Sequence, residues 1–507
     1  MKGNMNEKKV SAYRRIVSST AIFGSAQVLN ILVNIIRGKL VAYILHSTGM
    51  GIASIFTSAA NTIQQFALMG LNISAVPSIS QANNNADKQV LAFTIRLVRR
   101  IVLLASLLGL IVTVVLSPVL SNTSFSNQSY IPYFLLLSLA VFFNVMGTGE
   151  MAVMQGLRRY KMLAFCSIVP PLCGLLLSVP IYYFWGIEGI VPAMIVVNVI
   201  YFVIIRLLSY RNKQNEGQEK ISMKTMWIKG RGIIKFGAIM TFGSLLGTLT
   251  TYALIAFISN MGSIEDVGFY QASNVITSQY TGLVFTAMAT DYYPHLASLV
   301  KTNMQEAFRV INQQTEIIML IITPLAMLLI LTAPLAIRIL LTEEFLSIER
   351  MICFVGMASV FKALCFPRDY IIYAKGDNKI IFWVETVWGC TKTFSVMSLF
   401  YYFLGLDGLG YGALCVAIID VIVSLILIPW RYGFRFTRKT INLIIVNTLM
   451  ATVCLIGSLM PSSFEKYAIM SISTAACMVY CFVQLNKRVD LRVVISRIKN
   501  RRKKEDD

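Results

Sequence analysis

The chain has 507 residues, of which 56% are hydrophobic and only 14% charged, and its formal net charge is +21. A soluble protein would carry about 25% charged residues, so the composition excludes an ordinary soluble enzyme or binding module. Apolar runs of about 20 residues recur along the whole length, and each is long enough to cross a ~30 Å hydrocarbon layer as a helix. We therefore predict an all-α polytopic membrane protein.

About fourteen apolar stretches are predicted to be transmembrane helices. The first follows a basic flank, but it is longer than the apolar part of a signal peptide and lacks a clear cleavage site. The predicted spans are residues 17–44, 50–76, 97–118, 131–155, 163–185, 189–209, 233–259, 267–292, 314–341, 350–373, 380–404, 408–430, 441–460 and 465–486.

The basic residues lie at one set of span ends. Of the 45 Lys and Arg residues, 38 flank alternate ends, which the positive-inside rule assigns to the cytoplasm. Membrane topology therefore explains the positive charge better than nucleic-acid binding does, and we predict that both termini are cytoplasmic. Nine cysteines show no metal-ligand spacing and there are only two histidines, so no metal site or bound cofactor is expected.

The two halves of the sequence resemble each other, which indicates an internal repeat. Gly51 and Gly268 lie 217 positions apart in short hairpins between spans, and a proline follows each glycine after 26 residues, Pro77 and Pro294. The Phe-Gly-Ser motif of residues 23–25 recurs 219 positions later, and so does the Gly-Ile-Glu-Gly hairpin, as Gly-Leu-Asp-Gly. A nearly constant offset between equivalent hairpins indicates a duplication.

Six spans per repeat give both copies the same orientation, related by a pseudo-twofold axis along the membrane normal. We predict an N-terminal lobe at 1–210, a cytoplasmic linker at 211–232, and a C-terminal lobe at 233–432. Two additional helices would occupy 433–486, and a basic cytoplasmic tail 487–507.

Several short sequence motifs of low specificity resemble those of a known superfamily. They are Gly-Lys-Leu-Val-Ala at 38–42, the Gly-x-Gly hairpin at 49–51, the segment 70–78, and Val-Gly-Phe-Tyr-Gln-Ala-Ser at 267–273. Together with the layout, they are similar to the multidrug/oligosaccharidyl-lipid/polysaccharide (MOP) flippases, which include the MATE-type transporters. Within this superfamily the chain looks like the polysaccharide transporters, and in particular the Wzx-type O-antigen repeat-unit translocases.

The resemblance implies export rather than enzymatic chemistry. The implied substrate is an oligosaccharide on an undecaprenyl-pyrophosphate lipid, flipped across a bacterial inner membrane for O-antigen, capsule or exopolysaccharide assembly. Membrane lipids, a glycan polymerase and other assembly proteins are the implied partners.

Three cations inside the predicted spans are candidates for substrate binding, because a charge in the membrane is costly and usually marks a pathway. They are Arg37, Lys362 and Lys392, which we expect to attract a pyrophosphate headgroup. The alternative is that the lysines snorkel, or pair with acids such as Glu385 or Asp420, and only hold helices together.

Four acids inside spans are candidates for coupling to a proton or sodium gradient: Glu150, Asp291, Glu385 and Asp420. An acid in a dry cavity can bind and release a proton. For each of them, a structural ion pair is the competing interpretation.

Other function classes fit less well. A MATE-like exporter usually has twelve spans, and a lipid II-type flippase remains a second alternative. A membrane polymerase or ligase needs a large external loop, and no loop here is long enough. The chain lacks a GxxxxGK[ST] phosphate-binding loop, and a pure scaffold does not need charges in the membrane.

Overall fold

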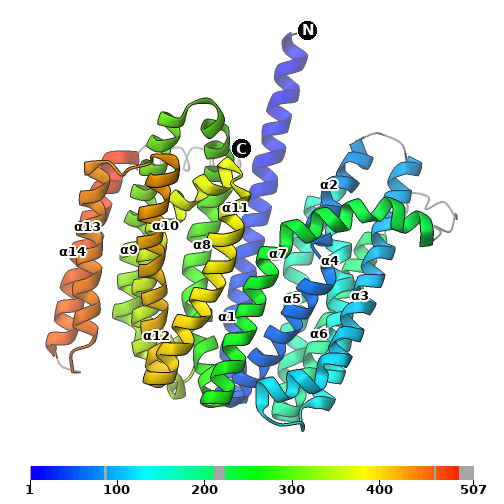
Figure 1. Cartoon of the computed structure of the whole chain (residues 1–507), viewed down its shortest axis with the longest axis horizontal. Coiled ribbons are helices and arrows are strands. Elements are labelled where there is room, and N and C mark those ends of the chain that lie inside the picture. Colours follow the sequence, from blue (N-terminus) through cyan, green and yellow to red (C-terminus); the bar gives the residue numbers. More distant parts are fainter. Residues whose placement is uncertain (1, 85–87, 211–222, 462–463, 490–507) are drawn as a thin grey trace, which may run out of the picture. The chain divides into compact units, whose positions relative to one another are not determined.

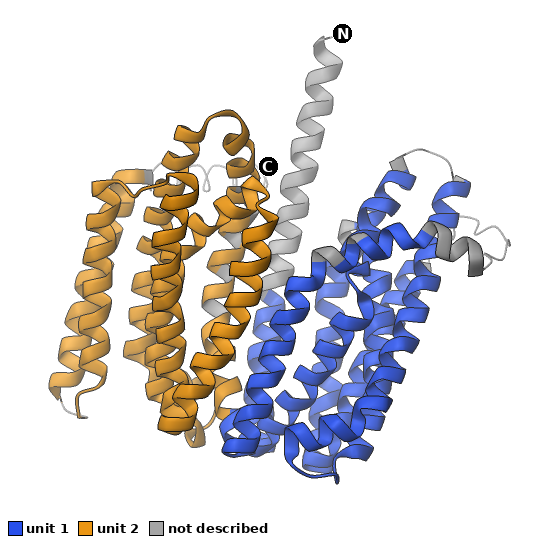
Figure 2. Cartoon of the chain, in the orientation of Figure 1, with its two compact units in different colours: residues 1–268 blue, residues 269–507 orange. Residues whose placement is uncertain are grey.

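The computed structural model describes most of the chain, with side chains from residue 29 onward apart from scattered positions. The described residues are 2–84, 88–210, 223–461 and 464–489. They are almost entirely helical, with no strand among them. They form two compact units, Met1–Gly268 and Phe269–Asp507 (Figure 2).

Unit 1 consists of seven long helices, one short 3₁₀ turn and the start of an eighth helix (Figure 1). These are α1 (Lys2–Leu68), α2 (Leu71–Asn84), α3 (Lys88–Phe125), α4 (Ile131–Gly156), α5 (Tyr160–Trp185), η1 (Gly186–Gly189), α6 (Ile190–Tyr210), α7 (Met223–Met261) and the first turns of α8 (Ile264–Thr302).

Helix α4 is the centre of unit 1. It packs against α3, α6, α2 and α1, while α5 lies against α1 and α6. Aromatic rings fill one end of this core: Phe56 meets Phe134 edge-on with centroids 5.0 Å apart, and Phe125 stacks on Tyr130 at 3.8 Å. Such pairs contribute about 0.5–1.5 kcal/mol beyond the area they bury.

Unit 2 contains the rest of α8 and the remaining elements (Figure 1). These are α9 (Met304–Leu340), η2 (Glu343–Ile348), α10 (Glu349–Lys375), α11 (Asn378–Ile380), the π-helical turn η3 (Ile381–Trp388), α12 (Gly389–Tyr432), α13 (Arg438–Ser458) and α14 (Phe464–Val489).

The two C-terminal helices are built onto α9. Both α13 and α14 pack against it, and α13 also touches α10. Ion pairs fix both ends of α14: Lys466 Nζ lies 3.0 Å from Glu349 of α10, and Arg488 Nε lies 2.6 Å from Glu316 of α9. The added pair of helices is therefore an integral part of unit 2.

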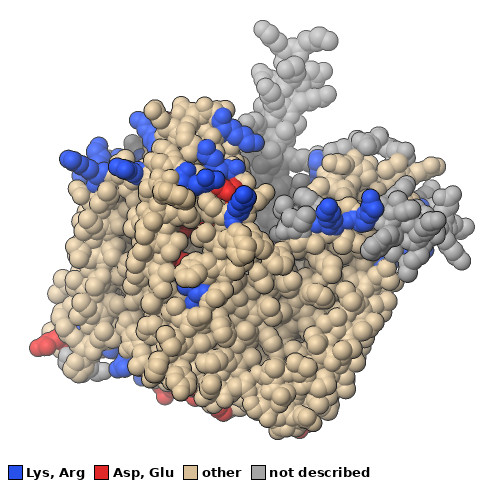
Figure 3. Space-filling view, viewed as in Figure 1, with Lys and Arg blue, Asp and Glu red and all other residues tan. Residues whose placement is uncertain are grey.

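The outward surfaces are apolar, as expected of helices in lipid. On α14, Ile472, Val479 and Phe482 are each more than 60% exposed. Figure 3 shows unit 2 as a nearly charge-free wall with Lys and Arg gathered at one end, interrupted by a small group of charges. Ten stretches of the described residues are long and apolar enough to cross a membrane. Three of the ten contain an internal break, and the total of fourteen spans stays a prediction.

Three hairpins show where continuous helices turn back. Helix α1 breaks at His46 (φ 55°, ψ −169°) and α12 at Gly405 (φ 59°, ψ −141°). Gly186, 219 positions before Gly405, has nearly the same conformation (φ 55°, ψ −133°). All three breaks fall between spans that the sequence separates, and the shared glycine conformation is what a duplicated hairpin requires.

Some predicted boundaries were wrong. The predicted span 50–76 is interrupted, because the chain turns at Met69 (φ 41°) and Gly70 (φ 71°) before α2 starts. A Cβ atom at Gly70 would overlap the carbonyl oxygen of Gly237, so the close approach of α7 requires glycine there.

Within the predicted linker at 211–232, α7 already begins at Met223. Residues 211–222 lie outside the described residues. The compact units divide after Gly268 because α7 packs against α1, α2 and α3. The lobes inferred from the repeat, 1–210 and 233–432, stay predictions.

The two glycine hairpins of the repeat contact each other within unit 1. A Cβ atom on Gly51 would overlap the carbonyl oxygen of Ile264, and one on Gly268 would overlap that of Ser47. Ser47 and Ile264 are themselves 217 positions apart, so the two contacts are equivalent. Thr48 Oγ1 adds a 2.7 Å hydrogen bond to Glu265, again across 217 residues.

Candidate functional site

The two arms of α1 carry matching polar stripes. Before the break at His46 lie Asn30, Asn34 and Arg37, and after it lie Thr57, Asn61 and Gln64. Each set has the spacing i, i+4, i+7, which places its members on one helix face. In both arms this face lines the same cavity.

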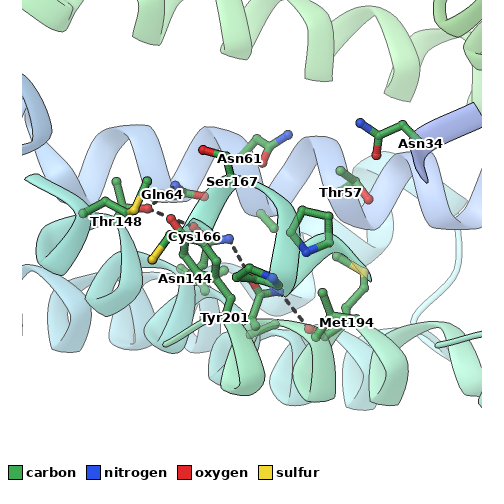
Figure 4. Close-up of a pocket in the computed structure, with 18 of the residues that line it drawn as sticks. Asn34, Thr57, Asn61, Gln64, Asn144, Thr148, Cys166, Ser167, Met194 and Tyr201 are labelled. Carbon is green, nitrogen blue, oxygen red and sulfur yellow. Dashed lines mark hydrogen bonds between the residues drawn. The ribbon is translucent and has the colours of Figure 1, made fainter. Parts of the chain in front are cut away.

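Helices α4, α5 and α6 complete a cavity of about 630 Å³ within unit 1 (Figure 4). This volume lies within the ~300–1,000 Å³ of small-ligand sites. The polar residues from these helices are Asn144, Thr148, Ser167, Asn198 and Tyr201. Aliphatic lining comes from Ala140, Val141, Val197 and both Pro170 and Pro171.

A hydrogen-bond chain crosses the cavity wall from α1 to α6 (Figure 4). Gln64 donates to Thr148 at 3.4 Å, Thr148 to Asn144 at 3.4 Å, and Asn144 to Asn198 at 2.6 Å. Asn198 then donates to the backbone oxygen of Met194 at 2.8 Å. The long links near Gln64 leave amide donors and acceptors that a ligand can use, because each amide has four hydrogen-bonding positions.

Gly147 positions the aromatic side of the cavity. A Cβ atom at this position of α4 would overlap the ring of Tyr201. The missing side chain lets Tyr201 of α6 lie directly against α4, which gives the cavity a flat aromatic wall. Sugars and other polar rings commonly use such a face together with directional hydrogen bonds.

The structure places Arg37, one of the three predicted substrate-binding cations, in this cavity. It is the one charged side chain among the described lining residues. The cavity therefore combines a single cation with many neutral amides. The sequence analysis missed the amides, although their helical spacing inside an apolar span was a usable signal.

Lys362 and Lys392 instead lie in unit 2, together with two of the predicted acids. Lys392 of α12 is buried and forms an ion pair with Asp420. Lys362 of α10 is exposed and interacts electrostatically with Asp420 and Lys392. Glu385, in the π-helical turn, is half-buried and interacts with Asp420 and Lys392.

Two further charges belong to this cluster and were not predicted. Arg368 is 1% exposed inside α10, with its guanidinium 5.4 Å from the ring centre of Phe436. Its Nε lies 3.9 Å from Asp369, which also accepts a hydrogen bond from Ser424.

Glu150 occupies a different setting, at one end of unit 1. It is 3% exposed and held by two arginines, with Arg99 Nε at 2.9 Å and Arg206 as the second partner. A carboxylate clamped from both sides joins α3, α4 and α6, which favours the structural interpretation. The side chain of Asp291, the fourth predicted acid, lies outside the described residues.

No metal centre is indicated in the part of the chain that the structure describes. No three His, Cys, Asp or Glu side chains there are grouped as metal ligands. The arrangement supports binding and charge neutralisation, with the amide cavity suited to uncharged polar groups and the charged cluster of unit 2 suited to an ionic one.

The fold is similar to those of solved structures described as a flippase and as transporters of the MOP superfamily. The chain is similar to a structure titled lipid II flippase MurJ, inward closed conformation (TM-score 0.68, 13% identity, covering 92% of this chain and 99% of that one). It is also similar to an inward-facing multidrug resistance MATE family transporter of the MOP superfamily (TM-score 0.65, 14% identity, 80% and 94%). A Vibrio cholerae MATE transporter, VcmN, has a TM-score of 0.51 at 15% identity (85% and 100%).

Residues 40–350 match the family model described as polysaccharide biosynthesis protein, and the chain belongs to this family. No curated protein matches the chain in sequence. The chain thus combines a polysaccharide biosynthesis family with a fold that is also found in a flippase and in multidrug transporters.

Proposed function

We propose that the chain is a flippase that moves a polyprenyl-pyrophosphate-linked oligosaccharide from the cytoplasmic to the outer leaflet by alternating access. The observation that carries the proposal is the amide-lined cavity with Arg37, in a chain of a polysaccharide biosynthesis family. Amides match the hydroxyl groups of a glycan, and a guanidinium matches a phosphate.

The lipid tail stays in the bilayer during transport, so only the headgroup requires a polar path. Desolvating a headgroup is costly unless protein groups replace its water. The cavity of unit 1 supplies such groups to the sugar, and the cations Arg37, Lys362 and Lys392 supply charge to the pyrophosphate. The protein works in a bacterial inner membrane with both termini cytoplasmic, delivering repeat units for O-antigen, capsule or exopolysaccharide assembly and to a glycan polymerase.

Coupling to a proton or sodium gradient belongs to the same proposal. The candidate groups are Glu385 and Asp420, which belong to the charged cluster of unit 2, and Asp291, with Glu150 as a weaker candidate because two arginines clamp it. Carboxylates near cations inside the membrane are the groups that transporters commonly use for this purpose.

A small-molecule exporter and a lipid II-type flippase are the competing functions. The match to a family model described as polysaccharide biosynthesis protein supports a glycan-bearing substrate over a small soluble one. The choice between repeat unit and lipid II depends on the sugar that the cavity accepts.

The proposal is tested with the full chain in proteoliposomes that contain a fluorescent polyprenyl-pyrophosphate oligosaccharide. Glycan accessibility to an external lectin should rise with time in protein-containing vesicles, and faster with the productive ion gradient. Empty vesicles and a cationic dye serve as controls. Export of the dye without movement of the glycan would replace the flippase with the exporter.

A further inference from the structure

Helix α5 presents two adjacent prolines to the cavity of unit 1. Pro170 and Pro171 both line it, and so do Cys166 and Ser167, one turn earlier. These four residues occupy one face of the helix, at positions i, i+1, i+4 and i+5. The cavity therefore borders the place where the backbone ladder of α5 is interrupted.

Proline has no backbone N–H, so it cannot bond to the carbonyl four residues before it. Pro170 leaves the carbonyl of Cys166 without its usual donor, and Pro171 does the same for Ser167. The hydroxyl of Ser167 donates to the backbone oxygen of Leu163 at 3.0 Å, so it cannot also donate into the cavity without breaking that bond. This wall of the cavity is consequently rich in hydrogen-bond acceptors.

Helices α1, α4 and α6 provide donors and apolar surface to the same cavity. Gln64 and Asn144 carry amide N–H groups beside the cavity, and the link from Gln64 to Thr148 is long, at 3.4 Å. Val141 and Val197 supply methyl groups from α4 and α6. Acceptors, donors and an apolar patch thus surround one space.

An acetamido group has the complementary set of features. Its N–H needs an acceptor, its carbonyl needs a donor, and its methyl group needs apolar surface. A free ammonium group would lack a carboxylate among the described lining residues, and burying it unpaired is costly. A plain hydroxyl would leave the apolar patch and part of the donor set unused.

We propose that this cavity binds an uncharged N-acetylated sugar of the glycan, with the acetamido N–H donating to the carbonyls that Pro170 and Pro171 leave open. The inference rests on the proposed function and names the substrate feature that the site selects. Buried polar groups discriminate strongly when a ligand fails to satisfy them.

The test compares three sugars that differ at one carbon: N-acetylglucosamine, glucose and glucosamine. Saturation-transfer NMR with the full chain in lipid nanodiscs measures the binding of each. The acetamido methyl of N-acetylglucosamine should receive the strongest transfer, and the other two sugars should bind at least roughly threefold more weakly, as expected for one lost hydrogen bond. Equal binding of all three sugars would overturn the inference.

The double variant Pro170→Ala/Pro171→Ala restores both N–H groups and should remove the preference. Pro180→Ala is the matched control, since Pro180 is an exposed proline of the same helix outside the cavity lining and should change nothing. If the double variant fails to fold, Asn144→Leu, which removes the donor wall, decides instead. An unchanged preference in a folded variant would refute the role of these groups.

The two proposals fail separately. Translocation of the lipid-linked glycan without an acetamido preference would remove this inference and leave the flippase intact. A clear acetamido preference without any translocation would retain the sugar site and contradict the flippase.

Discussion

Arg37 lines the cavity of unit 1 together with several neutral amide side chains, in a protein that has few charged residues. An arginine at the centre of a membrane helix costs about 2.5–3.5 kcal/mol on insertion scales. Among the described residues, no carboxylate lines the cavity to neutralise it. An anionic group of the ligand can do so, and the planar guanidinium is suited to bidentate hydrogen bonds with phosphate.

Replacing Arg37 with alanine should weaken the headgroup affinity roughly 10- to 100-fold, because a charge-assisted hydrogen bond contributes about 1.5–3 kcal/mol. Translocation rates at graded substrate density in proteoliposomes measure the effect. Arg37→Lys should recover only part of the loss. Lys39→Ala, an exposed cation two residues away, is the control, and transport at the normal rate by a folded Arg37→Ala protein would contradict the prediction.

Charge was the most informative property of single residues in the sequence. Arg37, Lys392 and Asp420 could be selected because ionised groups seldom occur inside spans, and the structure places each in a polar setting. Neutral amides carry a weaker signal, since Asn and Gln also occur as ordinary helix-packing residues. Their shared face becomes evident only when the second arm of α1 folds back at His46.

At the scale of elements, the break in α12 makes an ion pair possible. Lys392 lies before Gly405 and Asp420 after it, so the pair joins the two arms of one hairpin. Lys392 is buried, whereas Asp420 is half-exposed. A pair of this kind can hold the hairpin together, or it can open to let an anionic ligand reach Lys392.

Single replacements Lys392→Met and Asp420→Asn should each lower the melting temperature. The loss of stability should be smaller than the ~3–5 kcal/mol typical of a fully buried pair, since Asp420 is partly exposed. The double variant should recover most of the stability, because no charge is left unpaired. Thermal unfolding in detergent micelles measures this coupling. Transport lost in the stable double variant assigns a role in transport to the pair, and transport retained assigns the pair to structure alone.

The glycine hairpins should tolerate no side chain. Gly51→Ala and Gly268→Ala each force a Cβ atom into a backbone carbonyl, which cannot move aside as a side chain would. A loss of at least about 1–3 kcal/mol is expected, as for other overpacked sites. Gly38→Ala is the control, because no atom lies within 4 Å of its Cβ position. Equal melting temperatures for the three variants would contradict the close approach.

The hydrogen bond between Thr48 and Glu265 makes this contact sensitive to acid. The bond from Thr48 lowers the pKa of Glu265 below its ordinary value of 4.5. The associated stability is therefore fully present above pH 4.5 and is lost as the pH falls through the lower, folded-state pKa. Thr48→Val should be less stable than the natural protein at neutral pH, with the difference shrinking in acid. A constant difference down to pH 3 would refute the linkage.

Element boundaries followed from the sequence where a turn interrupts the apolar pattern, as at Gly186 and Gly405. They did not follow where the apolar pattern runs through the turn, as at Met69 and Gly70. There, the close approach of Gly237 from α7 determines the chain direction. A tertiary contact of this kind leaves no trace in local composition.

At the scale of the whole molecule, the membrane class followed from composition and charge asymmetry, whereas the family was suggested by a resemblance in short motifs and layout. The distribution of Lys and Arg also predicts that both termini are cytoplasmic, which requires an even number of spans. A fluorescent protein fused after Asp507 should fluoresce, and alkaline phosphatase fused there should be inactive. The reverse result would place the C-terminus outside and would refute the predicted orientation.

The repeat also relates residues that lie in different settings. Adding 219 to Glu150 gives Asp369, and both are buried or half-buried acids next to arginines. Adding 219 to Tyr201, which lines the amide cavity, gives Asp420 of the charged cluster. The pair Glu150 and Asp369 is acidic in both halves of the repeat, whereas the pair Tyr201 and Asp420 is neutral in one half and acidic in the other.

The reciprocal contact of Gly51 with Ile264 and of Gly268 with Ser47 has the form of an isologous interface, in which each contact between two identical subunits occurs twice. It is the arrangement expected if two copies of a six-helix ancestor paired as a homodimer before their genes joined. A homodimer must carry the same residue at both equivalent positions. Fusion into one chain removed that constraint, so that the amide-lined cavity of unit 1 and the charged cluster of unit 2 could evolve from equivalent positions of the repeat.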